Sequence, residues 1–153
     1  MILRAARRAA LLRPAPVLPL SPACFPKRGD SFMRAIRGAT TAAADTREEI
    51  LLATKELLQA MVRENSIEVY DIISIIFTTT RDLVSCFPAE AARELGWSYV
   101  PLLCAVEVPV KGDVPRCIRV LMHVASSLPA RDIRHIYLRG ARVLRPDLSG
   151  GSD

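Results

Sequence analysis

Apolar and polar residues alternate along several stretches of the chain with the two-residue period of β-strands. Residues 71–80, DIISIIFTTT, are β-branched and nearly all apolar, which predicts a strand covered on both faces. In residues 115–124, PRCIRVLMHV, the side chains at positions 118, 120, 122 and 124 share one apolar side. Pro101 and Pro109 bracket another apolar run and indicate an edge or bulged strand. We predict strands over residues 33–41, 71–80, 99–110, 115–124, 134–138 and 141–145.

The first of these strands is expected to end at Gly38, and a stretch with helical periodicity follows it. This stretch is DTREEILLATKELLQAMVREN, residues 45–65, in which Thr46 and Glu49 match a capping box. Asp45 is the alternative cap, and Asn65 can end the helix. The apolar stripe that we expect to face the core consists of Ile50, Leu51, Leu57, Leu58, Met61 and Val62.

Two shorter stretches also predict helices. FPAEAARELG, residues 87–96, has Pro88 at the first helical position and Gly96 as its terminator. SSLPARDI, residues 126–133, has Ser127 as a cap and a proline in its first turn. Because strands alternate with helices along the chain, the sequence predicts an α/β fold with a mixed sheet and helices on one face.

The first 32 residues carry all of the net charge and do not fit this pattern. They hold six basic residues and one acid, which equals the +5 of the whole chain. The rest is therefore neutral, so composition argues against a nucleic-acid-binding surface. Five prolines prevent a continuous helix or central strand in this part. We read it as a basic, Pro-rich extension to a domain at residues 33–148, with a flexible tail at 149–153.

Three origins of the extension stay open. It is a disordered tail, an Arg-rich organelle transit peptide, or translated upstream sequence with Met33 as the natural start. We favour the last, because a well-patterned strand follows Met33 directly.

Composition and cysteine spacing exclude further classes. No apolar run approaches the ~18 residues that a membrane span needs. The cysteines form no C-x-x-C and have no paired histidine spacing, so neither a disulfide scaffold nor a zinc site is expected, and a cytoplasmic location is the default. These cysteines are Cys24, Cys86, Cys104 and Cys117.

The usual catalytic motifs are missing from the sequence. It contains no glycine-rich phosphate loop and no G-x-S-x-G. His123 and His135 lie on strand-like segments without an obvious partner, and we read both as structural. Cys104 is more readily explained as a small buried residue than as a nucleophile.

Arginines at strand positions are the most informative feature. Arg119 interrupts an apolar strand, where a charge is costly to bury unless an anion pairs with it. Arg37 and Arg145 lie at the ends of other strand patterns, with Glu107 and Tyr137 on further ones. Converging arginines without a general base, metal or nucleophile suit a small anionic ligand and a unimolecular rearrangement. Arginines on solvated faces or in structural ion pairs are the alternative.

Four segments of the sequence closely resemble the monofunctional AroH-class chorismate mutases. They are MRAIRGATTAAADTREEI, FPAEAARELGWSYVPLLCAVEV, RCIRVLMHV and IRHIYLRGARVLRPDL. The resemblance covers residues 33–148. It implies an isomerase that converts chorismate to prephenate on the route to phenylalanine and tyrosine, needing no cofactor and no metal. It also implies a homotrimer with a pseudo-barrel core and active sites between subunits.

The resemblance also assigns roles to individual residues. Arg119 is expected beside the ether oxygen of the breaking bond, while Arg37 and Tyr137 hold a carboxylate and Glu107 accepts from the ring hydroxyl. The catalytic set is Arg119, Glu107 and Arg37. The substrate-binding set is Arg37, Phe87, Ala89, Arg93, Leu103, Cys104, Glu107, Arg119, Tyr137, Leu144 and Arg145.

Some positions depart from the family pattern. Glu90 stands where some members have lysine, Leu103 replaces a hydroxyl residue, and the segment around Gly96 is one residue shorter. Strand parity also puts Cys104 and Glu107 on opposite faces, so both line one pocket only if the backbone bulges or leaves the ladder.

Two other functions stay open at this point. A non-catalytic trimeric sensor of an aromatic-pathway carboxylate would keep the arginines but not turn over chorismate. An enamine or imine deaminase on a similar trimeric scaffold would need an activated water beside an arginine.

Overall fold

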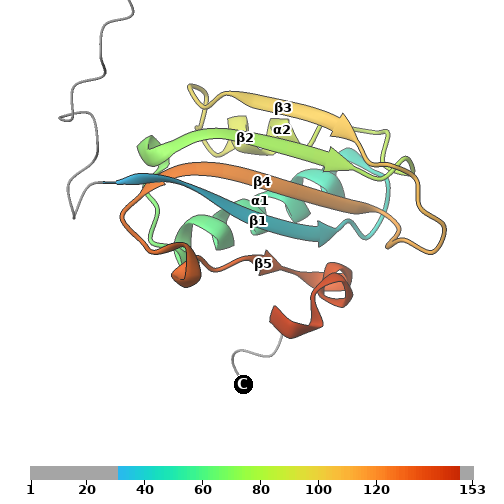
Figure 1. Cartoon of the computed structure of the whole chain (residues 1–153). Helices are drawn as coiled ribbons and strands as arrows, with labels where there is room; N and C mark the ends of the chain where they lie inside the picture. Colours follow the sequence, from blue (N-terminus) through green and yellow to red (C-terminus); the bar gives the residue numbers. More distant parts are fainter. Residues whose placement is uncertain (1–30, 149–153) are drawn as a thin grey trace, which may run out of the picture.

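A computed structural model describes residues 31–148. The expectations for residues 1–30 and 149–153 lie outside this range. Five strands form one sheet in the order β3-β2-β4-β1-β5, visible from top to bottom in Figure 1. The strands are β1 (Phe32–Thr41), β2 (Ile72–Thr79), β3 (Leu102–Val106), β4 (Cys117–Ser126) and β5 (Ile136–Tyr137). β4 runs antiparallel to both of its neighbours, while β3 is parallel to β2 and β5 is parallel to β1. The predicted mixed sheet is confirmed.

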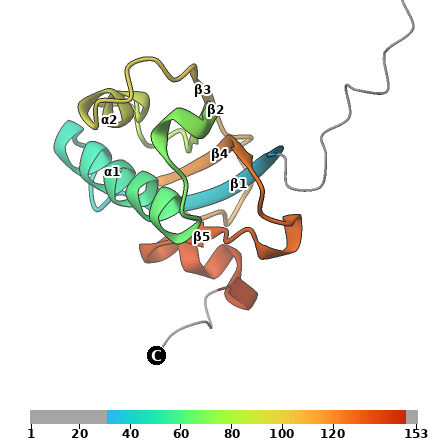
Figure 2. The same cartoon turned by 90° about the vertical axis from the view of Figure 1, so that its left-hand side faces the viewer.

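Both α-helices cover the same face of the sheet, as Figure 2 shows. They are α1 (Arg47–Glu64) and α2 (Ala89–Glu94). Thr46 caps α1, since its hydroxyl accepts the Glu49 N–H at 3.3 Å, and Asn65 ends the helix as predicted. Asp45 instead accepts the N–H groups of the 84–85 turn. The expected stripe is buried except for partly exposed Val62, and the leucines at 57 and 58 contribute to the main core.

The prediction that β1 ends at Gly38 is wrong, because the strand continues to Thr41. Gly38 has a packing role instead. A Cβ at this position would lie 2.5 Å from Met61 Sδ, so the missing side chain lets α1 lie close against β1.

Two element predictions fail near the C-terminus. Residues 126–133 form no α-helix. Ser126 still belongs to β4, and only a 3-10 turn forms at η3 (Ala130–Asp132), because Pro129 before it has an extended backbone with ψ 146°. The stretch 141–145 is not a strand but part of a 3-10 helix, η4 (Arg139–Leu144). Its i, i+3 period places Ala141 and Leu144 in one apolar cluster.

Three other elements are shorter than predicted. β3 spans five residues rather than the predicted 99–110, and it is an edge strand, as the flanking prolines indicated. The strand predicted at 134–138 is reduced to β5. The 87–96 helix is confirmed in a shorter form, with Gly96 at φ +85° as its terminator.

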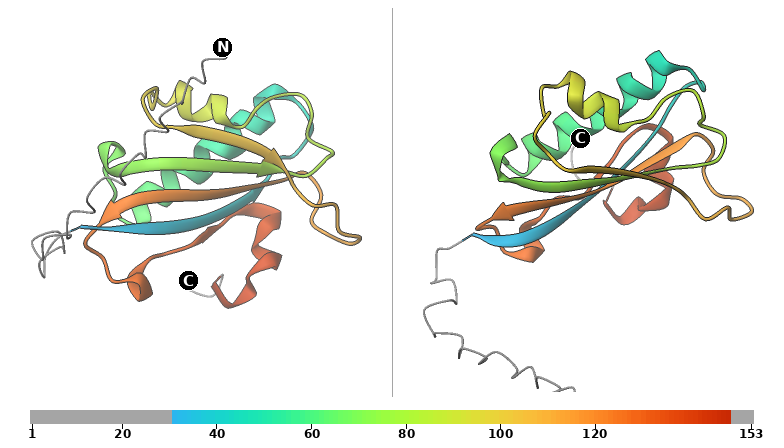
Figure 3. Two further views of the ribbon diagram at one scale, coloured as in Figure 1. Left: turned by 45° about the horizontal axis from the view of Figure 1, so that its top comes forward. Right: turned by 90° about the horizontal axis from the view of Figure 1, so that it is seen from above.

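On the face of the sheet away from the helices, η4 covers one end around Ala39 and Cys117, and the rest carries no further layer of the described chain (Figure 3, right). The prediction that β2 is covered on both faces is therefore wrong for the single chain, in which Ile73 is 44% exposed. On β4 the predicted alternation is confirmed: Ile118 and Val120 are buried, while Arg119 between them faces the open side. Hereafter the open face means this uncovered side of the sheet.

Candidate active site

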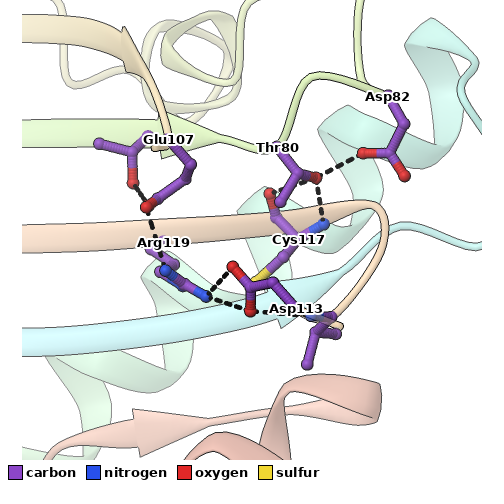
Figure 4. Close-up of polar contacts among 8 residues, drawn as sticks. Thr80, Asp82, Glu107, Asp113, Cys117 and Arg119 are labelled. Carbon is purple, nitrogen blue, oxygen red and sulfur yellow. Dashed lines mark hydrogen bonds and ion pairs between the residues drawn. The ribbon is translucent and has the colours of Figure 1, made fainter. Parts of the chain in front are cut away.

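Arg119 projects from the open face with two carboxylates beside it. Its Cα is paired with Ala39 of β1 and Thr78 of β2. Nη1 donates to Glu107 Oε2 at 3.0 Å, and Nη2 donates to both oxygens of Asp113 at 2.8 and 2.9 Å (Figure 4). The arginine that looked costly from sequence is thus compensated by two anions.

Both the backbone and the side chain of Glu107 are bonded to β2. Its backbone N–H donates to the Thr79 carbonyl at 2.9 Å, one step beyond the end of β3. Its carboxylate also accepts the Thr78 hydroxyl. Partial burial works against the charge of Arg119, but the neighbouring Cys117, Glu107 and Asp113 outweigh it and raise the pKa of the guanidinium. Arg119 is therefore a permanent cation.

A cavity of about 260 Å³ opens beside Arg119. It lies where β1, β4 and β5 meet η4. The residues that line it are Arg37, Gly38, Ala39, Arg119, Tyr137, Leu144 and Arg145. We call it the cationic pocket, since three arginines that are distant in sequence converge on it.

The other arginines of the cationic pocket differ in their partners. Among the described residues, the Arg37 guanidinium forms no ion pair. Its backbone N–H donates to His135 Nδ1 at 3.1 Å. Arg145 is held by Asp147 through bonds of 2.9 and 2.7 Å, and hydrogen bonding to this carboxylate raises the pKa of its guanidinium.

A second group of predicted site residues lies beside α2 and β3. Phe87 and Cys104 line a cavity of about 470 Å³ at this edge, which we call the edge pocket. Phe87 is 68% exposed, whereas Ala89 is buried. Burial raises the pKa of the Cys104 thiol, and this outweighs the opposing influence of the Ala89 N–H and Arg93. Cys104 is therefore a neutral thiol, in line with the non-nucleophilic reading.

The two groups do not meet within one chain. Cys104 is paired with the buried Phe77, on the helix-covered side of the sheet, whereas Glu107 reaches Arg119 on the open face. The ladder between β2 and β3 runs without a bulge from Leu102 to Val106. The predicted parity is confirmed, and no bulge brings both side chains into one pocket. Leu103, 59% exposed, lies on the open face instead.

Several contacts were not expected from the sequence. Asp113 was predicted only as part of a turn, but it binds Arg119. The only hint of this contact in the sequence is that an acidic residue precedes the arginine by six positions. Both histidines have partners: His135 accepts from Arg37, and His123 Nδ1 lies 3.0 Å from the Ser74 hydroxyl. Glu90 lines the edge pocket but is bound by Arg47, and this hydrogen bond lowers the pKa of its carboxyl.

Residues 31–148 hold neither a cluster of metal ligands nor a membrane-spanning helix. No group of three or more His, Cys, Asp or Glu side chains in this range could hold a metal ion. None of its helices is both long and apolar enough to cross a membrane.

Comparison with known proteins gives one consistent result. Residues 33–148 match the family described as chorismate mutase type I. The protein named chorismate mutase AroH from Bacillus subtilis (strain 168) is 49% identical over 119 residues, which is 77% of this chain and 94% of that protein. Its namesake from Thermus thermophilus is 53% identical over 118 residues, 76% of this chain and 97% of that protein.

A solved structure agrees with these sequence matches. The chorismate mutase from Clostridium thermocellum superposes with a TM-score of 0.70 at 50% sequence identity, over 71% of this chain and 97% of that one. The family match spans more than half of the chain, and the fold and the sequence lead to the same relatives. This chain belongs to the type I chorismate mutase family.

Proposed function

We propose that this protein is a chorismate mutase, an isomerase that converts chorismate to prephenate for phenylalanine and tyrosine synthesis. The convergence of Arg37, Arg119 and Arg145 on one cavity carries the proposal. Chorismate is a dicarboxylate, and guanidinium groups bind carboxylates through paired hydrogen bonds. The rearrangement is unimolecular, so it requires a restrained conformer and a stabilised charge rather than a nucleophile or base.

Arg119 supplies the central charge in this mechanism. As the C–O bond breaks and the C–C bond forms, negative charge grows on the ether oxygen. A fixed cation beside that oxygen stabilises the transition state more than the ground state, which is the condition for raising kcat. The raised pKa keeps Arg119 charged, and the ion pair with Glu107 orients its guanidinium.

The remaining pocket residues bind and orient the substrate. Arg37 and Tyr137 line the same cavity wall and would hold one carboxylate. Glu107 would accept a hydrogen bond from the ring hydroxyl while it holds Arg119 in place. Leu144 supplies an apolar wall.

We further propose that the complete site forms between copies of the chain in a homotrimer. β3 and β5 are the opposite edges of the sheet, about 19 Å apart at ~4.8 Å per strand. The cationic and edge pockets lie on different faces, so the edge pocket of one copy can complete the cationic pocket of the next, together with Arg93. The exposed Leu103 and Ile73 on the open face would be covered in the same assembly. Light scattering should then give three times the mass of the chain.

An ultraviolet assay of chorismate disappearance tests the proposed function. Arg119→Ala should lower kcat by ~10²-fold or more, since it removes a charge contact made in the transition state. Arg131→Ala is a matched control, because this arginine is 87% exposed at η3, away from the cationic pocket. A wild-type protein that binds chorismate without consuming it would be a sensor instead. Release of ammonia from an enamine or imine would support the deaminase.

The domain boundaries and the compartment belong to the same proposal. We propose residues 33–148 as the catalytic domain, preceded by an extension that is not needed for activity. A chain beginning at Met33 should keep the kcat and the free energy of unfolding of the full chain, and a loss of either would contradict this. The described cysteines Cys86, Cys104 and Cys117 are thiols, in keeping with the reducing cytoplasm that we propose.

A further inference from the structure

The loop between β3 and β4 lies next to Arg119 and is anchored at both of its ends. We call residues 108–115 the strap. Before it, Glu107 is bonded to Thr79. After it, the Arg116 N–H donates to Asp82 Oδ2 at 2.8 Å, and Ala42 donates to the Arg116 carbonyl at 2.9 Å. The chain between these anchors can move without disturbing the strands.

Little holds the strap itself against the protein. Within residues 31–148, its only hydrogen bonds to the rest of the fold are those that Asp113 accepts from Arg119. Val108 and Val110 are 76% and 64% exposed, and the strap projects past the end of the sheet (Figure 3, left). Gly112 has a φ of +84°, a conformation that glycine adopts readily in the turn before Asp113. Val114 adds a partial apolar contact with Ala39 and Cys117.

Arg119 is paired with one more carboxylate than it needs to balance its own charge. One guanidinium faces two carboxylates, and the Asp113 carboxylate holds Nη2 through both oxygens. An anionic ligand would bring a third negative charge to the same cation. The Glu107 carboxylate also accepts the Thr78 hydroxyl and its backbone is bonded to Thr79, whereas Asp113 is on the loosely held strap. Asp113 is therefore the group that can leave.

We propose that Asp113 is an internal competitor for the anionic group of the substrate, and that the strap opens when this group takes Nη2 of Arg119. With the strap closed, Arg119 keeps an anionic partner in the empty site. On binding, one carboxylate replaces another, so part of the substrate's binding free energy is spent on releasing Asp113. Asp113 then sets the affinity of the site for anions and takes no part in the chemical step.

Asp113→Asn tests this, because the amide keeps the shape of the side chain but lowers its hold on a cation. We expect KM for chorismate to fall about threefold to tenfold, the range for a partly exposed ion pair, with kcat unchanged. Asp113→Glu, which restores the charge, should return KM toward the wild-type value. Asp132→Asn, at the exposed η3 turn, is the control for the change in net charge and should leave KM unaltered.

The inference rests on the proposed function only for the identity of the substrate. Calorimetric titration with disodium malonate, a small dicarboxylate, measures the competition without any turnover. Tighter malonate binding by Asp113→Asn in a protein that does not consume chorismate would support the competitor and reject the proposed function.

Two results would overturn the inference. A lower kcat at unchanged KM in Asp113→Asn would mean that Asp113 positions Arg119 for the reaction rather than competing with the substrate. Equal malonate affinity in wild type, Asp113→Asn and Asp132→Asn would mean that the strap does not compete for the site.

Discussion

Met61 of α1 packs against Gly38 of β1 so closely that a Cβ on the glycine would lie 2.5 Å from the methionine sulfur. Gly38 also lines the cationic pocket, so this contact sets the distance between the helix layer and the strand that carries Arg37. The position requires glycine because of space, since its φ is not positive.

Gly38→Ala should therefore destabilise the protein by ~1–3 kcal/mol, the usual cost of overpacking a core. Denaturant unfolding measures this change. Met61→Ala and the double variant complete a double-mutant cycle. In this cycle, Gly38→Ala should lower the free energy of unfolding by less when Met61 is already alanine. Additive effects of the two substitutions would show that the contact is not tight.

Glu107→Gln should lower kcat about 10- to 100-fold, because it weakens both the acceptor for the ring hydroxyl and the anionic support of Arg119. Glu56→Gln is the matched control, since Glu56 pairs with Arg139 and neither residue lines the cationic pocket. Equal kcat values for the two variants would remove Glu107 from the mechanism.

His135 should make the stability of the protein depend on pH. Burial lowers the pKa of its imidazole from the ordinary 6.5, and repulsion by Arg37 and Arg145 lowers it further. The unfolded chain then binds this proton at a higher pH than the folded chain does. The free energy of unfolding should fall as the pH drops below about 6.5, until the lowered folded pKa has been passed.

His135→Asn tests this contribution, because the amide oxygen can still accept the Arg37 N–H but does not titrate. Denaturant unfolding at several pH values between about 7 and 5 should show a flatter profile for the variant than for wild type. An identical pH profile would assign the dependence to other groups.

Mixed assemblies test whether the site is shared between chains. Arg119→Ala impairs the cationic pocket, and Arg93→Ala impairs the half of the site that we propose the edge pocket supplies. Each variant alone should therefore be weakly active. Denaturing and refolding the two together should restore activity at up to about one quarter of the sites, where both intact halves meet. Each variant refolded alone is the control. Activity that stays at the mean of the two parents would place the whole site in one chain.

The parts of the fold that follow a strong period were predictable from the sequence. Arg119 lies opposite the buried side of β4, and Cys104 and Glu107 face different sides, because side chains alternate strictly along a strand. The 141–145 stretch was mispredicted because residues 141, 143 and 144 are all apolar, which fits the two-residue period of a strand as well as the three-residue period of a 3-10 helix. Only its packing against β1 decides between them.

The site was harder to predict from the sequence than the fold. Periodicity showed that Arg119 needed an anion but could not find Asp113, since an acid in an exposed turn ordinarily faces solvent. The convergence of Arg37, Tyr137 and Arg145 depends on β5 lying parallel to β1, a pairing of two residues that no local pattern specifies. The resemblance to a family supplied this grouping, and periodicity did not.

The alternation of side chains along β3 also affects how the activity would depend on the concentration of the protein. Cys104 and Glu107 are only three residues apart, yet Cys104 lines the edge pocket while Glu107 binds Arg119 on the open face. In the trimer that we propose, one chain would offer half of two sites rather than the whole of one. The rate per chain would then obey mass action: it is constant while chains are concentrated enough to associate, and falls on dilution as the assembly dissociates.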